Sequence, residues 1–94
     1  MGRPRSDYKI GFCSDYSCFR PEGALDCESV EITPEEIESL RLKNINGLDQ
    51  TAAAAKMGIS QSTFQRILAG AYKKVSQALI EGKELRILKP EAKA

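Results

Sequence analysis

With 94 residues, the chain is long enough for one small domain but too short to enclose a large active site. Its 41% hydrophobic and 29% charged residues are typical of a soluble globular protein, and no apolar run approaches the roughly 20 residues of a membrane span. The polar N-terminus does not resemble a signal peptide, so we expect a cytoplasmic protein.

The formal net charge is only +1, which is low for a protein that neutralises phosphates. The charges are segregated, however. Eight acidic residues and one basic residue lie between Asp15 and Glu38, whereas four basic residues and no acidic one lie between Gln50 and Ile80. This separation indicates an electropositive surface on the second half of the chain.

Residues 1–10 are rich in arginine, proline and polar residues and are predicted to form a basic, flexible arm. The stretch Gly2-Arg3-Pro4-Arg5 is similar to the core of the AT-hook, in which arginines lie in a narrow minor groove. Arg3 and Arg5 are therefore candidates for minor-groove contacts, and the alternative is an unstructured solubilising tail.

Residues 11–32 are predicted to form an irregular cysteine- and aromatic-rich loop packed on the core, ending in a short strand at Ser29–Ile32. Plain reduced thiols are the first interpretation of its three cysteines, Cys13, Cys18 and Cys27. Three thiols without any histidine do not complete a zinc site within one chain unless a nearby carboxylate or a second protomer contributes. No cofactor is expected, and zinc, an iron-sulfur cluster or a redox switch remain alternatives.

Residues 33–82 are predicted to form a helical domain of three to four helices. Its first helix is expected to begin with a capping box, in which Thr33 is the cap, Pro34 the first helical residue and Glu36 the reciprocal partner. This helix is expected to reach about Lys43, with Arg41 available to solvent or to a phosphate, and to end at Asn46-Gly47.

The stretch from Leu48 to Ala69 has the pattern of a DNA-binding helix-turn-helix. Asp49 and Ser60 are expected to cap its two helices, and Gly58 allows the left-handed conformation that ends the first. Small or apolar residues occupy the positions where the helices would meet, namely Ala53, Ala54, Met57, Ile59, Phe64 and Ile67. The alternative is a helical corner used only for packing or for binding a protein.

Side chains on the outer face of the second helix are suited to reading bases. Arginine bonds guanine bidentately, glutamine bonds adenine, and serine bonds either. The candidates are Gln61, Ser62, Gln65 and Arg66. Gln50, Lys73 and Lys74 are candidates for contacts with the DNA backbone.

An apolar stripe extends this helix to about Glu81, and Gly82 ends it. Gly70 interrupts the stripe at a cost of roughly 1 kcal/mol relative to alanine and permits a kink. Residues 83–94 form a charged tail, in which Leu85–Leu88 is a candidate strand against Val30–Ile32.

Several motifs together resemble a family of small, uncharacterised prokaryotic proteins thought to bind DNA. They are Gly2-Arg3-Pro4-Arg5, Phe19-Arg20-Pro21-Glu22-Gly23, Ile37-Glu38-Ser39-Leu40-Arg41-Leu42, Asn46-Gly47-Leu48, Ala53-Ala54, the run Met57–Leu68, Lys73-Lys74-Val75 and Ala78–Lys83. The family's helix-turn-helix is similar to region four of sigma factors, which reads the minus-35 promoter element. The resemblance implies that Gln61, Ser62, Gln65 and Arg66 face DNA.

Catalysis is not expected, because the chain offers no histidine as a general base, no glycine-rich phosphate loop and no base partner for a cysteine nucleophile. The sequence therefore predicts a transcriptional regulator that binds double-stranded DNA as a homodimer. One alternative is a module that binds a protein such as RNA polymerase. Another is a regulator that senses metal or redox state through its cysteines.

Overall fold

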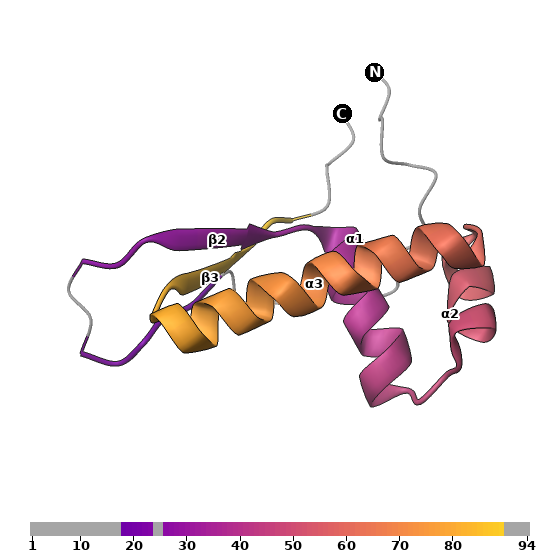
Figure 1. Ribbon diagram of the computed structural model, residues 1–94, viewed down its shortest axis with the longest axis horizontal. Coiled ribbons are helices and arrows are strands. Elements are labelled where there is room, and N and C mark those ends of the chain that lie inside the picture. Colours follow the sequence, from indigo (N-terminus) through magenta and orange to yellow (C-terminus); the bar gives the residue numbers. More distant parts are fainter. Residues whose placement is uncertain (1–17, 24–25, 90–94) are drawn as a thin grey trace, which may run out of the picture.

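The computed structural model describes residues 18–23 and 26–89 of the chain. In chain order, these residues form β1 (Cys18–Phe19), β2 (Ser29–Ile32), α1 (Pro34–Leu40), the π-helical segment η2 (Arg41–Ile45), α2 (Gln50–Met57), α3 (Gln61–Glu81) and β3 (Glu84–Ile87) (Figure 1). This part of the chain is mostly helical, as expected, with three α-helices and a small sheet. None of the helices described is long and apolar enough to cross a membrane.

The sheet has the strand order β1-β3-β2, so the strand that comes last in the chain is central. β3 runs parallel to β2, with Val30 opposite Leu85 and Ile32 opposite Ile87, which confirms the expected pairing. β1 runs antiparallel to β3 on the other side. β1 was not expected, because two residues are too short to produce a recognisable alternation of polar and apolar side chains.

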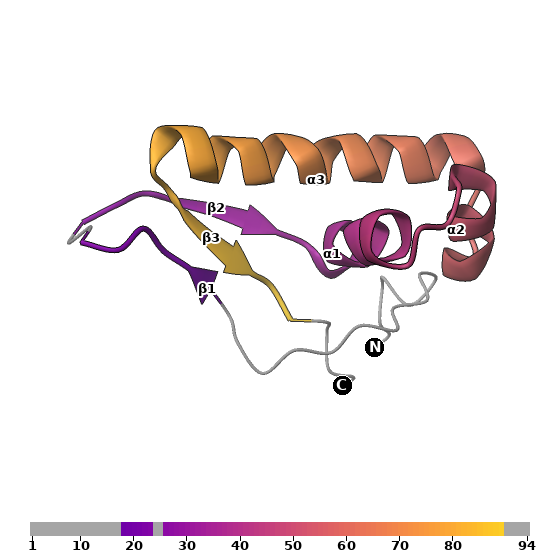
Figure 2. The ribbon, with the colours of Figure 1, turned by 90° about the horizontal axis from the view of Figure 1, so that it is seen from below.

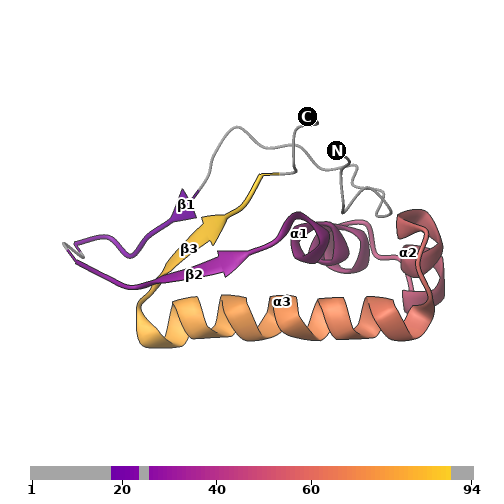
Figure 3. The same ribbon diagram turned by 90° about the horizontal axis from the view of Figure 1, so that it is seen from above.

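The sheet packs against the C-terminal half of α3, as Figures 2 and 3 show from opposite sides. Ile32 and Ile87 form a buried cluster with Ala71 of α3. Half-buried apolar side chains surround this cluster, namely Ile37, Leu40, Val75 and Leu85. The predicted charged tail therefore begins with a strand that belongs to the core.

α1 begins as its sequence predicts. Thr33 Oγ1 accepts a hydrogen bond from the Glu36 N–H (3.2 Å), and the Glu36 carboxylate accepts one from the Thr33 N–H (2.9 Å). The end of the helix differs from the prediction, because five residues from Arg41 onward adopt π-helical geometry in which the Asn46 N–H donates to the Arg41 carbonyl. Gly47, with φ at +74°, then turns the chain toward α2.

α3 continues through Gly70 as a single helix of 21 residues. Gly70 instead serves the contact with α1, because a Cβ at this position would lie 2.9 Å from Glu36 Oε2. The other carboxylate oxygen of Glu36 lies 2.8 Å from Lys74 Nζ. Gly70 thus allows the carboxylate at the start of α1 to reach the middle of α3.

This contact predicts that Gly70→Ala has opposing effects. Alanine should favour the helix by about 1 kcal/mol. Displacing the Glu36 carboxylate should remove a comparable contribution, about 1 kcal/mol, from the cap and its ion pair. In wild-type protein we therefore expect little net change in the free energy of unfolding. In Glu36→Ala protein, the same substitution should stabilise by about 1 kcal/mol.

Urea unfolding of the two single variants and the double variant measures this coupling. Ser76→Ala, on the exposed side of α3, is the matched control and should have the same effect with or without Glu36. Identical effects of Gly70→Ala in both backgrounds would show that the carboxylate does not restrict this position.

Candidate nucleic-acid interface

The turn between α2 and α3 follows from local sequence. Asp49 caps α2 by accepting a hydrogen bond from the Ala52 N–H (2.8 Å). At the other end Gly58 has φ at +72°, the Gly58 N–H donates to the Ala55 carbonyl, and the Ile59 N–H donates to the Ala54 carbonyl. This pair of bonds is the Schellman pattern, which satisfies the last carbonyls of a helix.

Ser60 starts α3 immediately after this turn. Its hydroxyl accepts a hydrogen bond from the Thr63 N–H at 3.2 Å. Both caps and the glycine turn were predicted from the sequence, and all three predictions are confirmed.

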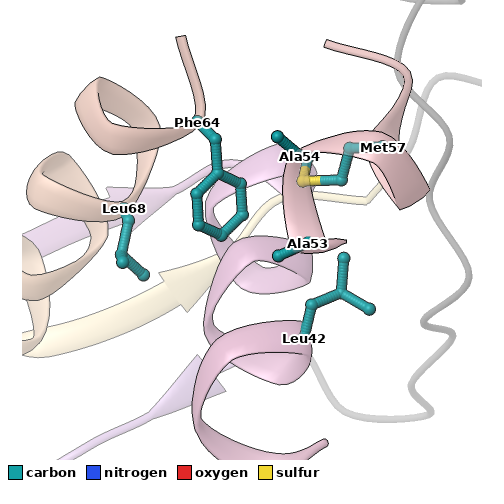
Figure 4. Close-up of a cluster of buried hydrophobic side chains, with 6 residues drawn as sticks. All are labelled: Leu42, Ala53, Ala54, Met57, Phe64 and Leu68. Atoms are coloured by element: carbon teal, nitrogen blue, oxygen red, sulfur yellow. The ribbon is translucent and has the colours of Figure 1, made fainter. Parts of the chain in front are cut away.

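A buried apolar cluster fixes how α2 packs against α3. Phe64 of α3 is fully buried and lies beside small and flexible side chains of α2 (Figure 4). The members of this cluster are Leu42, Ala53, Ala54, Met57, Phe64 and Leu68. Ile59 packs against its edge, and the alanines let the two helices approach closely. Four of the six predicted contact residues are buried, whereas Ile59 and Ile67 are half-buried.

The four candidate base-reading side chains occupy the first two turns of α3, and all four are exposed. Gln61 lies one turn before Gln65, and Ser62 lies one turn before Arg66, so they form two adjacent rows on the helix surface. Gln61 and Gln65 have partners on α2. Thr51 Oγ1 donates to Gln61 Oε1 at 3.4 Å, and Gln65 Nε2 donates to Gln50 Oε1 at 2.7 Å.

The three candidates for backbone contacts have different environments. Gln50, the first residue of α2, lies next to Gln65 through the bond just described. Lys73 is exposed. Lys74 is half-buried, and its ammonium group forms an ion pair with Glu36. Lys73 is therefore available for a phosphate, whereas Lys74 would first have to leave Glu36.

Arg41 was expected to be available to solvent or to a phosphate, but its guanidinium is held by a carboxylate. Its Nε and Nη2 donate to the two oxygens of Glu38 at 2.9 and 2.8 Å. These hydrogen bonds raise the pKa of Arg41 above its ordinary value, against the opposing effect of partial burial. Arg41, the first residue of η2, thus forms an intramolecular ion pair with Glu38 of α1, and the expectation was wrong.

Two of the predicted interface residues, Arg3 and Arg5, lie outside the described residues, as does Cys13. Cys18 on β1 and Cys27 before β2 are free thiols and are half-buried. Arg20 Nη2 lies 3.8 Å from the sulfur of Cys27. Within the part of the chain that the structure describes, no three potential metal ligands lie together.

Comparison with known proteins places the chain in a family. A family model described as "Protein of unknown function DUF134" matches residues 1–93. The chain belongs to this family. No solved structure matches it significantly.

Curated relatives named UPF0251 protein are similar along nearly the whole chain. The relative from Desulforudis audaxviator is 45% identical over 89 residues, which cover 93% of this chain and 58% of the relative. The relative from Halothermothrix orenii is 43% identical, with 92% and 65% covered. The relative from Shewanella baltica is 38% identical over 95 residues, with 99% and 97% covered. The chain thus spans about three-fifths of the first two relatives and almost all of the third.

Sequence reasoning did not identify Asn44 and Tyr72, two residues near the exposed polar side chains at the start of α3. Asn44 Nδ2 lies 3.0 Å from the Tyr72 hydroxyl oxygen. The sequence contained a partial signal, because Tyr72 lies seven residues after Gln65 and seven residues are close to two helical turns. The partner from η2 required the tertiary structure.

The left-handed conformation of Gly58 predicts a specific cost for substitution. Gly58→Ala should lower the free energy of unfolding by about 1 to 2 kcal/mol, because a Cβ disfavours positive φ. Gly58→Asn should cost less, since asparagine adopts this conformation more readily. Urea unfolding tests both variants. Equal losses for alanine and asparagine would contradict the conformational explanation.

Proposed function

We propose that the chain is a sequence-specific double-stranded DNA-binding protein, a transcriptional regulator in which α2 and α3 act as a helix-turn-helix. One observation carries the proposal: the first two turns of α3 present four exposed hydrogen-bonding side chains beside a capped, glycine-ended turn. In DNA-binding proteins of this class, the N-terminal part of the second helix enters the major groove.

The dimensions of this surface fit the groove. The candidate base-reading residues extend from Gln61 to Arg66, a rise of roughly 7.5 Å along the helix. The major groove is about 12 Å wide and admits an α-helix. Arg66 is suited to bind the O6 and N7 atoms of guanine, and Gln65 to bind the N6 and N7 atoms of adenine.

The bond between Gln50 and Gln65 supports a role for both residues. This 2.7 Å hydrogen bond restrains the Gln65 side chain in the free protein, so less side-chain entropy is lost when DNA binds. Gln50 stands at the N-terminus of α2, and its side-chain amide hydrogens are suited to donate to a phosphate. We propose that Gln50 positions Gln65 while contacting the DNA backbone.

The charges on α2 and α3 support the same surface. Lys56, Arg66 and Lys73 are all exposed. Among the described residues, several carboxylates are paired with cations of the chain itself, as in the pairs Arg41–Glu38, Lys74–Glu36 and Arg20–Glu84. The basic side chains of α2 and α3 therefore favour a polyanion, and binding should weaken as salt concentration rises.

The proposal is tested by exposing the purified chain to genomic DNA fragments at two salt concentrations and sequencing the bound duplexes. A common sequence motif that survives the higher salt supports sequence-specific binding. Purely salt-sensitive binding without a motif would contradict sequence specificity. Absence of any binding would contradict the proposed DNA-binding function.

Arg66→Ala tests base reading directly. It should weaken binding to the recovered motif by about 1 to 3 kcal/mol and relax preference at one base pair. Lys89→Ala removes the same charge from an exposed position beyond β3 and is the matched control. Fluorescence anisotropy with the recovered duplex and a random duplex measures both variants. Equal losses of Arg66→Ala on the two duplexes would contradict a base contact.

Exposed apolar side chains at the end of α3 favour a protein partner in addition to DNA. Leu79 and Ile80 are 78% and 83% exposed, which is unusual for residues of this size. We propose that this end of α3 contacts a second copy of the chain, so that two recognition helices bind two half-sites. RNA polymerase is the alternative partner for this surface.

Leu79→Glu should therefore shift the chain toward monomer in sedimentation velocity, because a charge would be buried at the contact. Glu81→Gln, on the same turn, is the control and should leave the association unchanged. A chain that is monomeric before substitution at all concentrations would contradict the dimer.

A further inference from the structure

Three polar side chains of α3 lie in one row and each contacts a side chain of a preceding element. Along α3 they are separated by four and then seven residues, and the total of eleven is close to three helical turns. The contacts are Gln61 with Thr51, Gln65 with Gln50, and Tyr72 with Asn44. The first two belong to the surface described above, whereas the third lies beyond it and joins η2 to α3.

The contact between Asn44 and Tyr72 is accessible. Asn44 is exposed, and 43% of Tyr72 is exposed. The hydroxyl oxygen of Tyr72 lies 3.0 Å from Asn44 Nδ2 and 3.3 Å from Asn44 Oδ1. An asparagine amide carries two N–H donors, and a tyrosine hydroxyl both donates and accepts. The pair therefore retains hydrogen-bonding capacity for an acceptor from solvent.

The position of this pair matches the edge of a DNA groove. Tyr72 lies seven residues beyond Gln65, which corresponds to about 10.5 Å along the helix axis. The major groove is about 12 Å wide, so a helix that places Gln65 on the bases carries Tyr72 to the bordering sugar-phosphate backbone. Asparagine and tyrosine side chains are both used for phosphate contacts in protein–DNA complexes. Lys73, exposed on the next position of α3, adds a positive charge nearby.

We propose that Asn44 and Tyr72 together bind a backbone phosphate at the border of the groove. In this arrangement Tyr72 positions the Asn44 amide, and the two groups extend the interface from α2 and α3 to η2. The inference rests on the proposed DNA-binding function and adds two residues that set the register of α3 in the groove. A phosphate contact carries no sequence information, so its loss should affect all duplexes alike.

The test compares Tyr72→Phe and Asn44→Ala in the full chain, with Ser76→Ala as a control. Ser76→Ala also removes an exposed hydroxyl from α3, one turn beyond Tyr72. Each interface variant should weaken binding by about two- to tenfold, the usual effect of one hydrogen bond. The loss should be equal on the recovered motif and on a random duplex, and Ser76→Ala should bind like wild type. Circular dichroism at the assay temperature verifies that each variant is folded.

A neutral methylphosphonate, placed at one backbone position at a time, identifies the phosphate. At the contacted position the wild-type chain should lose affinity, and Tyr72→Phe or Asn44→Ala should cause no further loss. Additive losses at every position would overturn the inference, as would unchanged binding by both variants while Gln65→Ala binds more weakly. That second result would leave the proposed function standing and would show that the pair only ties η2 to α3. Failure of the wild-type chain to bind any duplex would overturn both proposals.

Discussion

The carboxylate of Glu36 fixes where α1 crosses α3, and both halves of the structure depend on this crossing. It caps its own helix through the Thr33 N–H, reaches the ammonium group of Lys74, and occupies the space that a side chain at position 70 would need. The Glu36 carboxylate therefore takes part both in the local cap of α1 and in the long-range contact with α3. Because the carboxylate is partly shielded from solvent, its ion pair is screened less than an ordinary surface pair.

From this crossing α3 serves two separate clusters. Its N-terminal half packs Phe64 against the small residues of α2, and its C-terminal half covers the sheet at Ala71. Leu40 of α1 packs against both clusters and links them. The polar surface at the start of α3 is thus supported by a helix held along its whole length. This support suits a surface that must present several side chains at fixed spacing.

Features that depend on a few neighbouring residues were predictable from the sequence. The caps at Thr33, Asp49 and Ser60 and the glycine turn at Gly58 are local, so their residue types alone indicate them. The partners of Lys74 and Gln65 were not predictable, since they depend on how helices pack. The partner of Arg41 is Glu38, three residues earlier, so the expectation that Arg41 is free for a phosphate missed a local i,i+3 pair. β1 was missed because its order comes from pairing with β3.

The central place of β3 in the sheet has a consequence for the order of assembly. The helices form contacts between segments that are close in the chain, so they can associate early, while synthesis on the ribosome continues. β2 emerges before all the helices but its parallel neighbour emerges after them, and β1 has no partner until the same moment. Until β3 has left the ribosome, both β1 and β2 of the nascent chain lack their partner strand. Chaperones that recognise extended segments would therefore meet this chain at β1 and β2, before the sheet supports α3.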